Sequence, residues 1–351
     1  MTQFYKSVLT LIIAIAGILS VRAYDFQMDG IYYNIMGNDQ VEVTSGEIRY
    51  VGNIVIPTTI EFDSTLYSVS SIGESAFWGS DISSISIPET VTNIKDGAFS
   101  HSSLISMNIP NSVKEIGYLV FDGCKSLQSV TLSQNVKEIK YGTYKDCISL
   151  SAINLPESLS IIEESAFEGC TVLNNLELPI SLIKIDNYGF KDCCSLEYIM
   201  IPNSVLSIGK EAFKNCAKLK DVKLSEQLNS IPSGLFENCS SLTSIEIPAM
   251  VEKIDGLFAF YGCVNLTEFK VDQANQYYSS LSGILYNKDF SSLLQCPEGR
   301  EGDIVIPDTV IEIRGDSFVN CFKLNTIFIP KSVIDIDDSW GTNNSFALSS
   351  L

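Results

Sequence analysis

Histidine and basic side chains are scarce in this sequence, and their scarcity argues against several classes of function. One histidine, His101, occurs among 351 residues. The histidines that a zinc site or a histidine general base would need are therefore almost absent. Lysine and arginine number 23 against 42 acidic residues. This excess of negative charge repels phosphate backbones and anionic lipid surfaces, so we expect no nucleic acid or membrane-surface partner. The 45% hydrophobic content nevertheless supports an extensive core.

Long apolar runs are missing except near the N-terminus. There Lys6 precedes an apolar run from Val8 to Leu19, and small residues at Val21 and Ala23 follow, a pattern that predicts a cleaved signal peptide of residues 1–23. The alternative is a membrane anchor, but the run is shorter than the ~20 apolar residues that span a bilayer. Cleavage would remove two basic residues and no acidic one, leaving 21 against 42, a net charge of −21. We therefore expect a secreted or cell-surface protein without membrane insertion.

A repeat of 22 to 24 residues dominates the chain from Ile56 onward. Its consensus is I-P-x-S-V-x-x-I-x-x-x-A-F-x-x-C-x-x-L-x-x-I-x-I. The alternating x-I-x-I-P segment predicts a short strand ended by proline, and S-V-x-x-I predicts a second extended run. The spacing in A-F-x-x-C-x-x-L predicts one helical or 3₁₀ turn. Each unit is too small to bury its own apolar face, so the units must stack into a solenoid with strands ~4.8 Å apart.

Motifs such as IPNSVLSIGKEAFKNCAKL and LPESLSIIEESAFEGCTVL resemble the BspA-like leucine-rich repeat family of secreted and cell-surface proteins. The resemblance runs from about residue 50 to the end of the sequence. It implies a leucine-rich-repeat solenoid, mainly β with short helical or 3₁₀ turns. It also implies adhesion to host or neighbouring-cell proteins, extracellular-matrix proteins among them.

Two segments outside the repeat pattern predict β-hairpins. Residues 24–56 alternate apolar and polar side chains around Gly-Asn-Asp, and we interpret them as an N-terminal β cap over an open strand edge. Residues 272–306 have two apolar runs around Asn-Lys-Asp and predict a hairpin insertion. Leucine-rich repeats then fill residues 57–271 and 307–351. Leu351 falls inside a repeat, with Phe346 as its Phe, which indicates a truncated sequence or an atypical ending.

The cysteines follow the repeat. One position of the repeat, beneath a turn, is filled by Cys or Ser, which favours a small buried side chain there. We therefore predict that the repeated cysteines are reduced and pack in a row, the cysteine ladder, rather than bind a metal ion. Disulfides between neighbouring rungs are allowed by the ~4.8 Å spacing, but parallel side chains point the wrong way for them. Cys194 and Cys296 lie outside the shared position, and Cys194 is the better candidate for a reactive thiol. The shared position holds Cys124, Cys147, Cys170, Cys193, Cys216, Cys239, Cys263 and Cys321, with Ser80, Ser102 and Ser349 in shorter repeats.

Other groups with chemical potential do not form a catalytic set. His101 is interpreted as a turn residue, and the carboxylate pair Glu163-Glu164 as a solvated face. An acidic stretch near the C-terminus lacks the glycine turn and distal glutamate of a calcium loop. We therefore predict no enzyme, no cofactor and no metal site. The acidic stretch is Asp335, Asp337 and Asp338, and the glycosylation acceptors, relevant only in a eukaryotic source, are Asn238, Asn265 and Asn343.

The outward positions of the predicted strands change character along the chain. From Ser84 to Asn154 they are small and neutral, whereas from Glu177 onward they are charged, aromatic or long. Tyrosine, methionine and mixed charge are typical of protein interfaces, although random drift of exposed positions gives the same pattern. We predict a ligand-binding sheet face centred on Tyr198 and Met200. Its residues are Glu177, Tyr198, Met200, Asp221, Lys223, Glu246, Glu268 and Lys270.

Two functions fit these observations. The first is a non-enzymatic, secreted or surface-exposed adhesion scaffold whose sheet face binds a protein, an extracellular-matrix protein of a host being the class that the resemblance implies. The alternative is a structural or glycan-binding accessory protein of the cell envelope.

Overall fold

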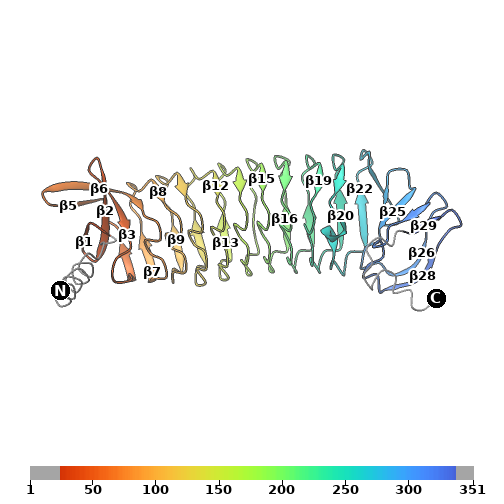
Figure 1. Ribbon diagram of the computed structural model, residues 1–351, viewed down its shortest axis with the longest axis horizontal. Coiled ribbons are helices and arrows are strands. Elements are labelled where there is room, and N and C mark those ends of the chain that lie inside the picture. The colour runs from red at the N-terminus through yellow and green to blue at the C-terminus, as the bar shows by residue number, and fades with distance from the viewer. Residues whose placement is uncertain (1–23, 337–351) are drawn as a thin grey trace, which may run out of the picture.

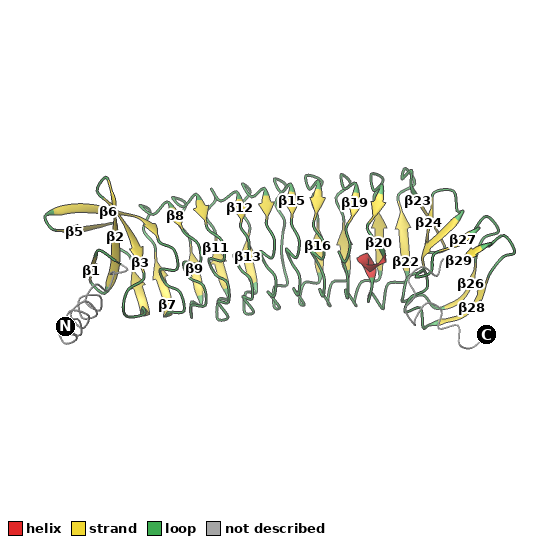
Figure 2. Ribbon diagram, viewed as in Figure 1, coloured by secondary structure: helices red, strands yellow, loops and turns green. Residues whose placement is uncertain are grey.

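The computed structural model describes residues 24–336 as an elongated solenoid of short strands (Figures 1 and 2). One rung follows the next along the rod, so residues 23 apart in the sequence lie side by side. For example, Ser129 pairs in parallel with Ser106 on one side and Ala152 on the other. The predicted signal peptide and the last partial repeat lie outside the described residues.

The x-I-x-I-P segments form one row of parallel strands. The first residue pairs with the first residue of the next rung, because every rung repeats the same alternation of outward and inward side chains. The row comprises β4 (Val51–Val55), β7 (Asp81–Ser86), β9 (Ser106–Asn108), β11 (Ser129–Thr131), β13 (Ala152–Asn154), β16 (Tyr198–Met200), β18 (Asp221–Lys223), β20 (Ser244–Ile247), β22 (Glu268–Val271), β26 (Gly302–Val305) and β28 (Leu324–Phe328).

The S-V-x-x-I segments form a second row of shorter parallel strands. Their repeated spacing puts an isoleucine into the core in most rungs, as at Ile162 and Ile185, whereas Ile336 in the last described rung is exposed. The row comprises β8 (Asn93–Ile94), β10 (Glu115–Ile116), β12 (Glu138–Ile139), β14 (Ile161–Ile162), β15 (Lys184–Ile185), β17 (Ser207–Ile208), β19 (Ser230–Ile231), β21 (Lys253–Ile254), β27 (Glu312–Ile313) and β29 (Asp335–Ile336).

An aromatic stack runs through the core between these rows. One buried ring per rung lies against the ring of the next, with centroids 5.2 to 6.0 Å apart and interplanar angles of 4 to 19°. Offset stacking at this distance adds to the energy of simple burial. The stack consists of Phe77, Phe99, Phe121, Tyr144, Phe167, Phe190, Phe213, Phe236 and Phe260.

The turns that carry these rings differ from the prediction of a helical or 3₁₀ turn in each repeat. Residues 24–336 contain one 3₁₀ helix, η1 (Leu257–Phe260), and the other turns keep single bonds such as Cys216 N–H to the Phe213 carbonyl, 3.3 Å. The cause is the residue before the cysteine, which has a positive φ, for example 61° at Asn215. A left-handed residue stops a right-handed helix after one bond.

Antiparallel hairpins lie at the N-terminal end of the described solenoid and in the insertion. In the range of the predicted cap, β1 (Phe26–Met28), β2 (Ile31–Gly37) and β3 (Gln40–Thr44) pair antiparallel, and β3 then pairs in parallel with β6 (Thr65–Ile72). β4 lies in the same range but pairs in parallel with β7 of the solenoid. A further hairpin, β5 (Thr59–Phe62) with β6 (Thr65–Ile72), was not predicted. In the insertion, β23 (Tyr278–Leu281), β24 (Ile284–Asn287) and β25 (Ser292–Gln295) pair antiparallel.

Candidate functional site

The centre of the predicted binding face lies on two paired strands. β16 and β18 run in parallel with Tyr198 opposite Asp221 and Met200 opposite Lys223. Between these positions the side chains of Ile199 and Val222 turn into the core, so the four outward side chains are held on one surface. Tyr198 and Met200 are 47% and 50% exposed. Large apolar side chains fixed on a strand and open to solvent are the kind of group that anchors a protein interface.

The next two rungs add charge to the same face. β20 and β22 pair with Glu246 opposite Lys270, and Lys270 Nζ lies 2.8 Å from Glu268 Oε1 within its own strand. All of these side chains are exposed except Glu268, which is half-buried. Because the charges of opposite sign lie in adjacent positions, they compensate each other, and the face has no strong field of one sign there.

Glu177 is exposed, but the strand that was predicted to carry it is not formed. The prediction placed Asn175 and Glu177 as the outward pair of a strand, whereas the structure forms one isolated bridge, Ala152 to Asn175, and Glu177 lies in the connecting segment. Two successive asparagines, Asn174 and Asn175, begin this segment, and asparagine is a poor strand former. Glu177 is therefore separated from the paired strands that carry the other seven predicted residues.

Exposed apolar side chains that the sequence did not predict lie at the N-terminal end of this row. On β4, Val51 and Val55 are 66% and 72% exposed beside Asp81 and Ser86 of β7. The predicted outward positions begin at Ser84 and are small and neutral in the first rungs, so they do not include these valines. The alternation in Val51–Val55 is a signal for an outward-facing strand, but the segment falls within the predicted N-terminal cap.

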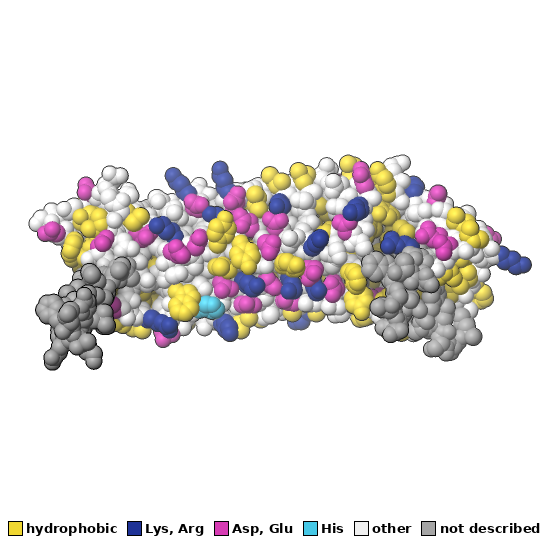
Figure 3. All heavy atoms as spheres, in the orientation of Figure 1, with side chains coloured by type: hydrophobic (Ala, Val, Ile, Leu, Met, Phe, Trp, Pro, Cys, Tyr) yellow, Lys and Arg dark blue, Asp and Glu magenta, His cyan; other side chains and the backbone are white. Residues whose placement is uncertain are grey.

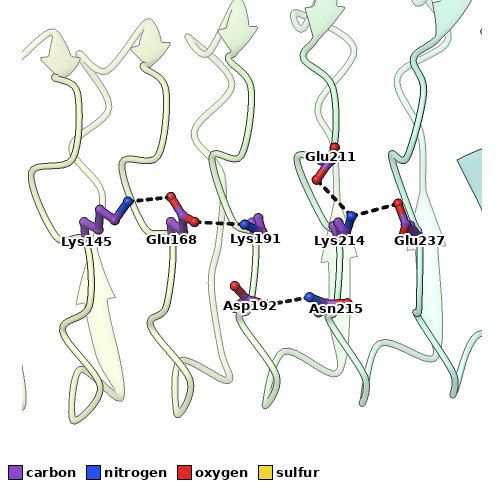
Figure 4. A network of polar contacts seen from close by, with 8 residues as sticks. All are labelled: Lys145, Glu168, Lys191, Asp192, Glu211, Lys214, Asn215 and Glu237. Carbon is purple, nitrogen blue, oxygen red and sulfur yellow. Dashed lines mark hydrogen bonds and ion pairs between the residues drawn. The ribbon is translucent and has the colours of Figure 1, made fainter.

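A different surface of the solenoid carries rows of polar contacts. On the turns, Lys145 and Lys191 lie 3.1 and 3.0 Å from the two carboxylate oxygens of Glu168 in the rung between them (Figure 4). Burial alone would raise the pKa of Glu168, but hydrogen bonds from Ser165 and both lysines outweigh it and lower that pKa. Lys214 pairs in the same way with Glu237 of the next rung, 3.0 Å away.

These contacts tie neighbouring rungs together and leave little net charge exposed. Figure 3 shows basic and acidic side chains mixed along the viewed face of the rod. Each cation in Figure 4 already has a carboxylate partner, so the row is a structural feature rather than a binding site.

The cysteine ladder is buried over seven rungs. Each thiol donates to the carbonyl of the aromatic residue in the preceding rung, as Cys216 Sγ does to Phe190 O at 3.3 Å. Burial raises the pKa of each of these thiols, to about 11 at Cys124, so they remain protonated and poorly nucleophilic near neutral pH. No disulfide is formed among the ten cysteines, all of which lie in the described part of the chain. Cys321 departs from the prediction because it is only half-buried.

Two other candidates from the sequence, His101 and Cys194, lie on turns. His101 has φ 58° before the small residue Ser102, and its Nε2 lies 3.6 Å from Asp122 Oδ2. Cys194 is half-buried, so its thiol is partly accessible, as a reactive thiol must be. The same partial burial, however, raises its pKa. Within residues 24–336, no three His, Cys, Asp or Glu side chains are grouped to hold a metal ion, and no helix is long and apolar enough to cross a membrane. Asp337, Asp338, Asn343, Phe346 and Ser349 lie outside the described residues.

Comparison with known proteins agrees with this repeat architecture. The family described as "BspA type Leucine rich repeat region" matches the chain in six copies, over residues 57–173, 137–267 and 300–350. These ranges together cover well over half of the sequence. A comparison with curated proteins gives no match.

Several solved structures are similar. A leucine rich cell surface protein from Faecalibacterium prausnitzii A2-165 is 25% identical, with a TM-score of 0.54 over 89% of this chain and 72% of that chain. A leucine-rich repeat protein from Bacteroides ovatus ATCC 8483 is 25% identical, with a TM-score of 0.57 over 90% of this chain and 91% of that chain. The pneumococcal vaccine antigen PcpA, 16% identical with a TM-score of 0.50 over 88% and 99%, shares the fold.

Proposed function

The chain belongs to the BspA-type leucine-rich repeat family, and on that premise we propose that it is a secreted or surface-exposed scaffold that binds another protein through the sheet face of β16, β18, β20 and β22. The family is one of repeat scaffolds that are generally non-enzymatic. One observation carries the proposal: Tyr198 and Met200 are exposed on a rigid strand whose backbone is paired and whose alternate side chain is buried.

Rigidity is what makes these two side chains suitable as anchors. Binding costs free energy whenever flexible groups must be ordered. Strand residues that are already held by parallel pairing and core contacts lose little further conformational freedom on binding, so this cost is small. The adjacent charges, Asp221, Lys223, Glu246 and Lys270, provide a polar rim of both signs that can select a partner with complementary charges. A surface of this composition fits a protein partner. An extracellular-matrix protein of a host is the class we propose.

The location outside the cell is part of the proposal. A structurally similar protein is described as a cell surface protein, and residues 1–23 of this chain have the pattern of a signal peptide. Fractionation of cells that express the full chain, with N-terminal sequencing of the exported product, tests it. Retention of the uncleaved chain in the cytoplasm would contradict the proposed location.

The binding surface is tested with one double variant and one matched control on the same row of strands. Purified protein is applied to immobilised matrix proteins, and Tyr198→Ala with Met200→Ala is expected to weaken binding by about tenfold or more, since truncation of interface anchors costs ~2 kcal/mol or more. The control is Ser129→Ala with Thr131→Ala on β11, which are exposed in the equivalent positions. Equal binding by both double variants, or binding to a glycan array without any protein ligand, would contradict the proposal.

A further inference from the structure

Two cysteines near the C-terminal end of the described solenoid differ from the rest of the ladder. In the ladder each thiol holds one carbonyl at 3.0 to 3.3 Å. Cys321 Sγ instead lies 3.6 to 3.7 Å from three carbonyls, those of Cys296, Pro297 and Val319. Its thiol is therefore held by no single short hydrogen bond.

The reason is the rung that precedes Cys321. Elsewhere the preceding rung presents the carbonyl of a stacked aromatic residue, but here the hairpin insertion ends on β25 and presents Cys296 and Pro297 in that place. The side chain of Cys296 is 1% exposed and lies in a second, smaller hydrophobic cluster, against which Cys321 packs. Cys296 and Cys321, 25 residues apart, are therefore not an equivalent pair of the kind found along the ladder, where successive cysteines are 23 or 24 residues apart.

The two thiols converge on one carbonyl group. Both sulfur atoms lie within 3.7 Å of the same Pro297 carbonyl oxygen. A side-chain hydrogen bond between Cys296 and Cys321, and after it burial, raises the pKa of Cys296. In the ladder the largest cause of a raised thiol pKa is burial itself. The shared carbonyl therefore distinguishes this pair from the ladder, in which each thiol has a carbonyl of its own.

We propose that Cys296 and Cys321 are an oxidation site, at which a low-molecular-weight disulfide such as oxidised glutathione converts the two thiols into one intramolecular disulfide. Cys321 reacts first because it is half-buried, whereas Cys296 is enclosed. Its thiolate attacks one sulfur of the oxidant, which forms a mixed disulfide and releases one thiolate. Cys296 then attacks the Cys321 sulfur and gives its proton to the departing sulfur, so the second half of the oxidant leaves as a thiol. Two protein thiols are oxidised, and one disulfide is reduced to two thiols.

The position of the bond gives it a structural consequence. The hydrophobic core is divided into a main cluster and the smaller one formed by the insertion and the following repeats. The disulfide would join the end of β25 to the turn before β28 and would enclose β26 and β27 in a covalent loop. It would thereby restrain the part of the solenoid that the main core does not hold.

The test uses the full chain, reduced and then incubated under native conditions with oxidised glutathione. Free thiols are next alkylated in denaturant, and the peptides are mapped by mass spectrometry. We expect the free thiol count to fall from the ten of the reduced protein by two, and one crosslinked peptide pair to contain Cys296 and Cys321. The variant Cys194→Ser, which removes the other half-buried thiol, is the matched control and should form the crosslink at an unchanged rate.

Two single variants separate the steps. Cys296→Ser should stop at a stable glutathione adduct on Cys321, and Cys321→Ser should leave Cys296 unmodified, because the enclosed thiol cannot reach the oxidant first. A crosslink between any other pair of cysteines in the native protein would overturn the proposal. So would a Cys321 that stays unmodified while glutathione adds to Cys194, since the same sample then shows that the oxidant is active.

Discussion

Tyr144 is the one tyrosine in the aromatic stack, and its hydroxyl is out of place there. The ring is fully buried between Phe121 and Phe167, with centroid distances of 5.4 and 5.2 Å. Its hydroxyl oxygen has no hydrogen-bond partner within the described residues. Burial raises the pKa of this hydroxyl well above its usual value, so it stays neutral but lacks the hydrogen bond it would make with water.

Removal of that hydroxyl should stabilise the protein. We expect Tyr144→Phe to raise the free energy of unfolding by ~1 kcal/mol, because the orphaned polar group is lost and the ring stacking is kept. Phe167→Tyr, the reverse change one rung away, should lower it by ~1–3 kcal/mol. Urea denaturation followed by circular dichroism measures both. A loss of stability in Tyr144→Phe would show that the hydroxyl is satisfied in solution.

Repetition let the sequence predict the residues that fill the core, but it did not reveal the backbone conformation beside them. The Cys or Ser position was identified because neighbouring repeats substitute one for the other, and seven of its cysteines are fully buried. The left-handed residue before this position was missed. The signal was present, since glycine, asparagine, aspartate and histidine favour positive φ. Those residues are Gly79, His101, Gly123, Asp146, Gly169, Asp192, Asn215, Asn238, Gly262 and Asn320.

At the scale of the strand, the consensus predicts position but not length. Strands of two or three residues gain little from their own propensity, and a local run of poor strand formers can abolish one, as the asparagines before Glu177 do. The strands that carry the candidate binding face were therefore predicted well where each strand alternates regularly, at Tyr198–Met200 and Asp221–Lys223. It was predicted poorly where the alternation is broken.

The insertion is joined to the repeats by a buried carboxylate that no sequence pattern indicated. Glu298 is 4% exposed, and its Oε1 accepts hydrogen bonds from Gly262 N–H at 2.8 Å and Asn320 Nδ2 at 3.2 Å. These donors come from the rung before the insertion and the rung after it. Burial raises the pKa of Glu298, and the two hydrogen bonds offset this only in part.

This raised pKa predicts a pH dependence with a definite sign. A carboxyl group whose pKa is higher in the folded than in the unfolded state binds its proton more tightly when folded. It therefore stabilises the fold at acid pH, and this contribution is lost as pH rises through the folded-state pKa. Relative to Glu298→Gln, the wild type should gain unfolding free energy as the pH falls from neutral to about 4.

The measurement is urea denaturation of both proteins across this pH range. The exposed Glu61→Gln serves as a control for the general loss of negative charge. A wild type that gains no unfolding free energy relative to Glu298→Gln on acidification, or that loses some, would refute the argument.

At the scale of the whole molecule, the sequence predicted the architecture because a solenoid has only nearest-neighbour contacts. A unit that cannot bury its own apolar face must stack on its copies, and the period of 23 fixes which residues meet. The hairpins at the N-terminal end and in the insertion depend instead on particular turns, so the one at Asp63-Ser64 between β5 and β6 went unpredicted. Function is harder to predict from the sequence than the hairpins are, because the outward side chains take no part in the packing that creates the repeat.

Nearest-neighbour packing also predicts that a whole repeat can be excised. Deletion of residues 111–133 removes 23 residues and joins Pro110 to Gln134, so the position of Ser133 is taken by its equivalent, Pro110. Phe99 would then stack on Tyr144, and the Cys147 thiol would meet the Phe99 carbonyl as the Cys124 thiol does now at 3.0 Å. We expect a folded rod shorter by ~4.8 Å in small-angle scattering, with partner binding retained because the strands from Tyr198 onward are untouched.

The register, rather than the number of residues removed, decides this outcome. Deletion of residues 111–122 removes about half as many residues but puts the aromatic and cysteine positions of one rung beside polar positions of the next. The apolar core side chains of one rung would then contact polar side chains of the next rung all across the junction. We therefore expect aggregation or loss of the β signal in circular dichroism. If the short deletion were tolerated as well as the long one, the rungs would not depend on in-phase stacking. The aromatic stack and the cysteine ladder would then not be what holds the solenoid together.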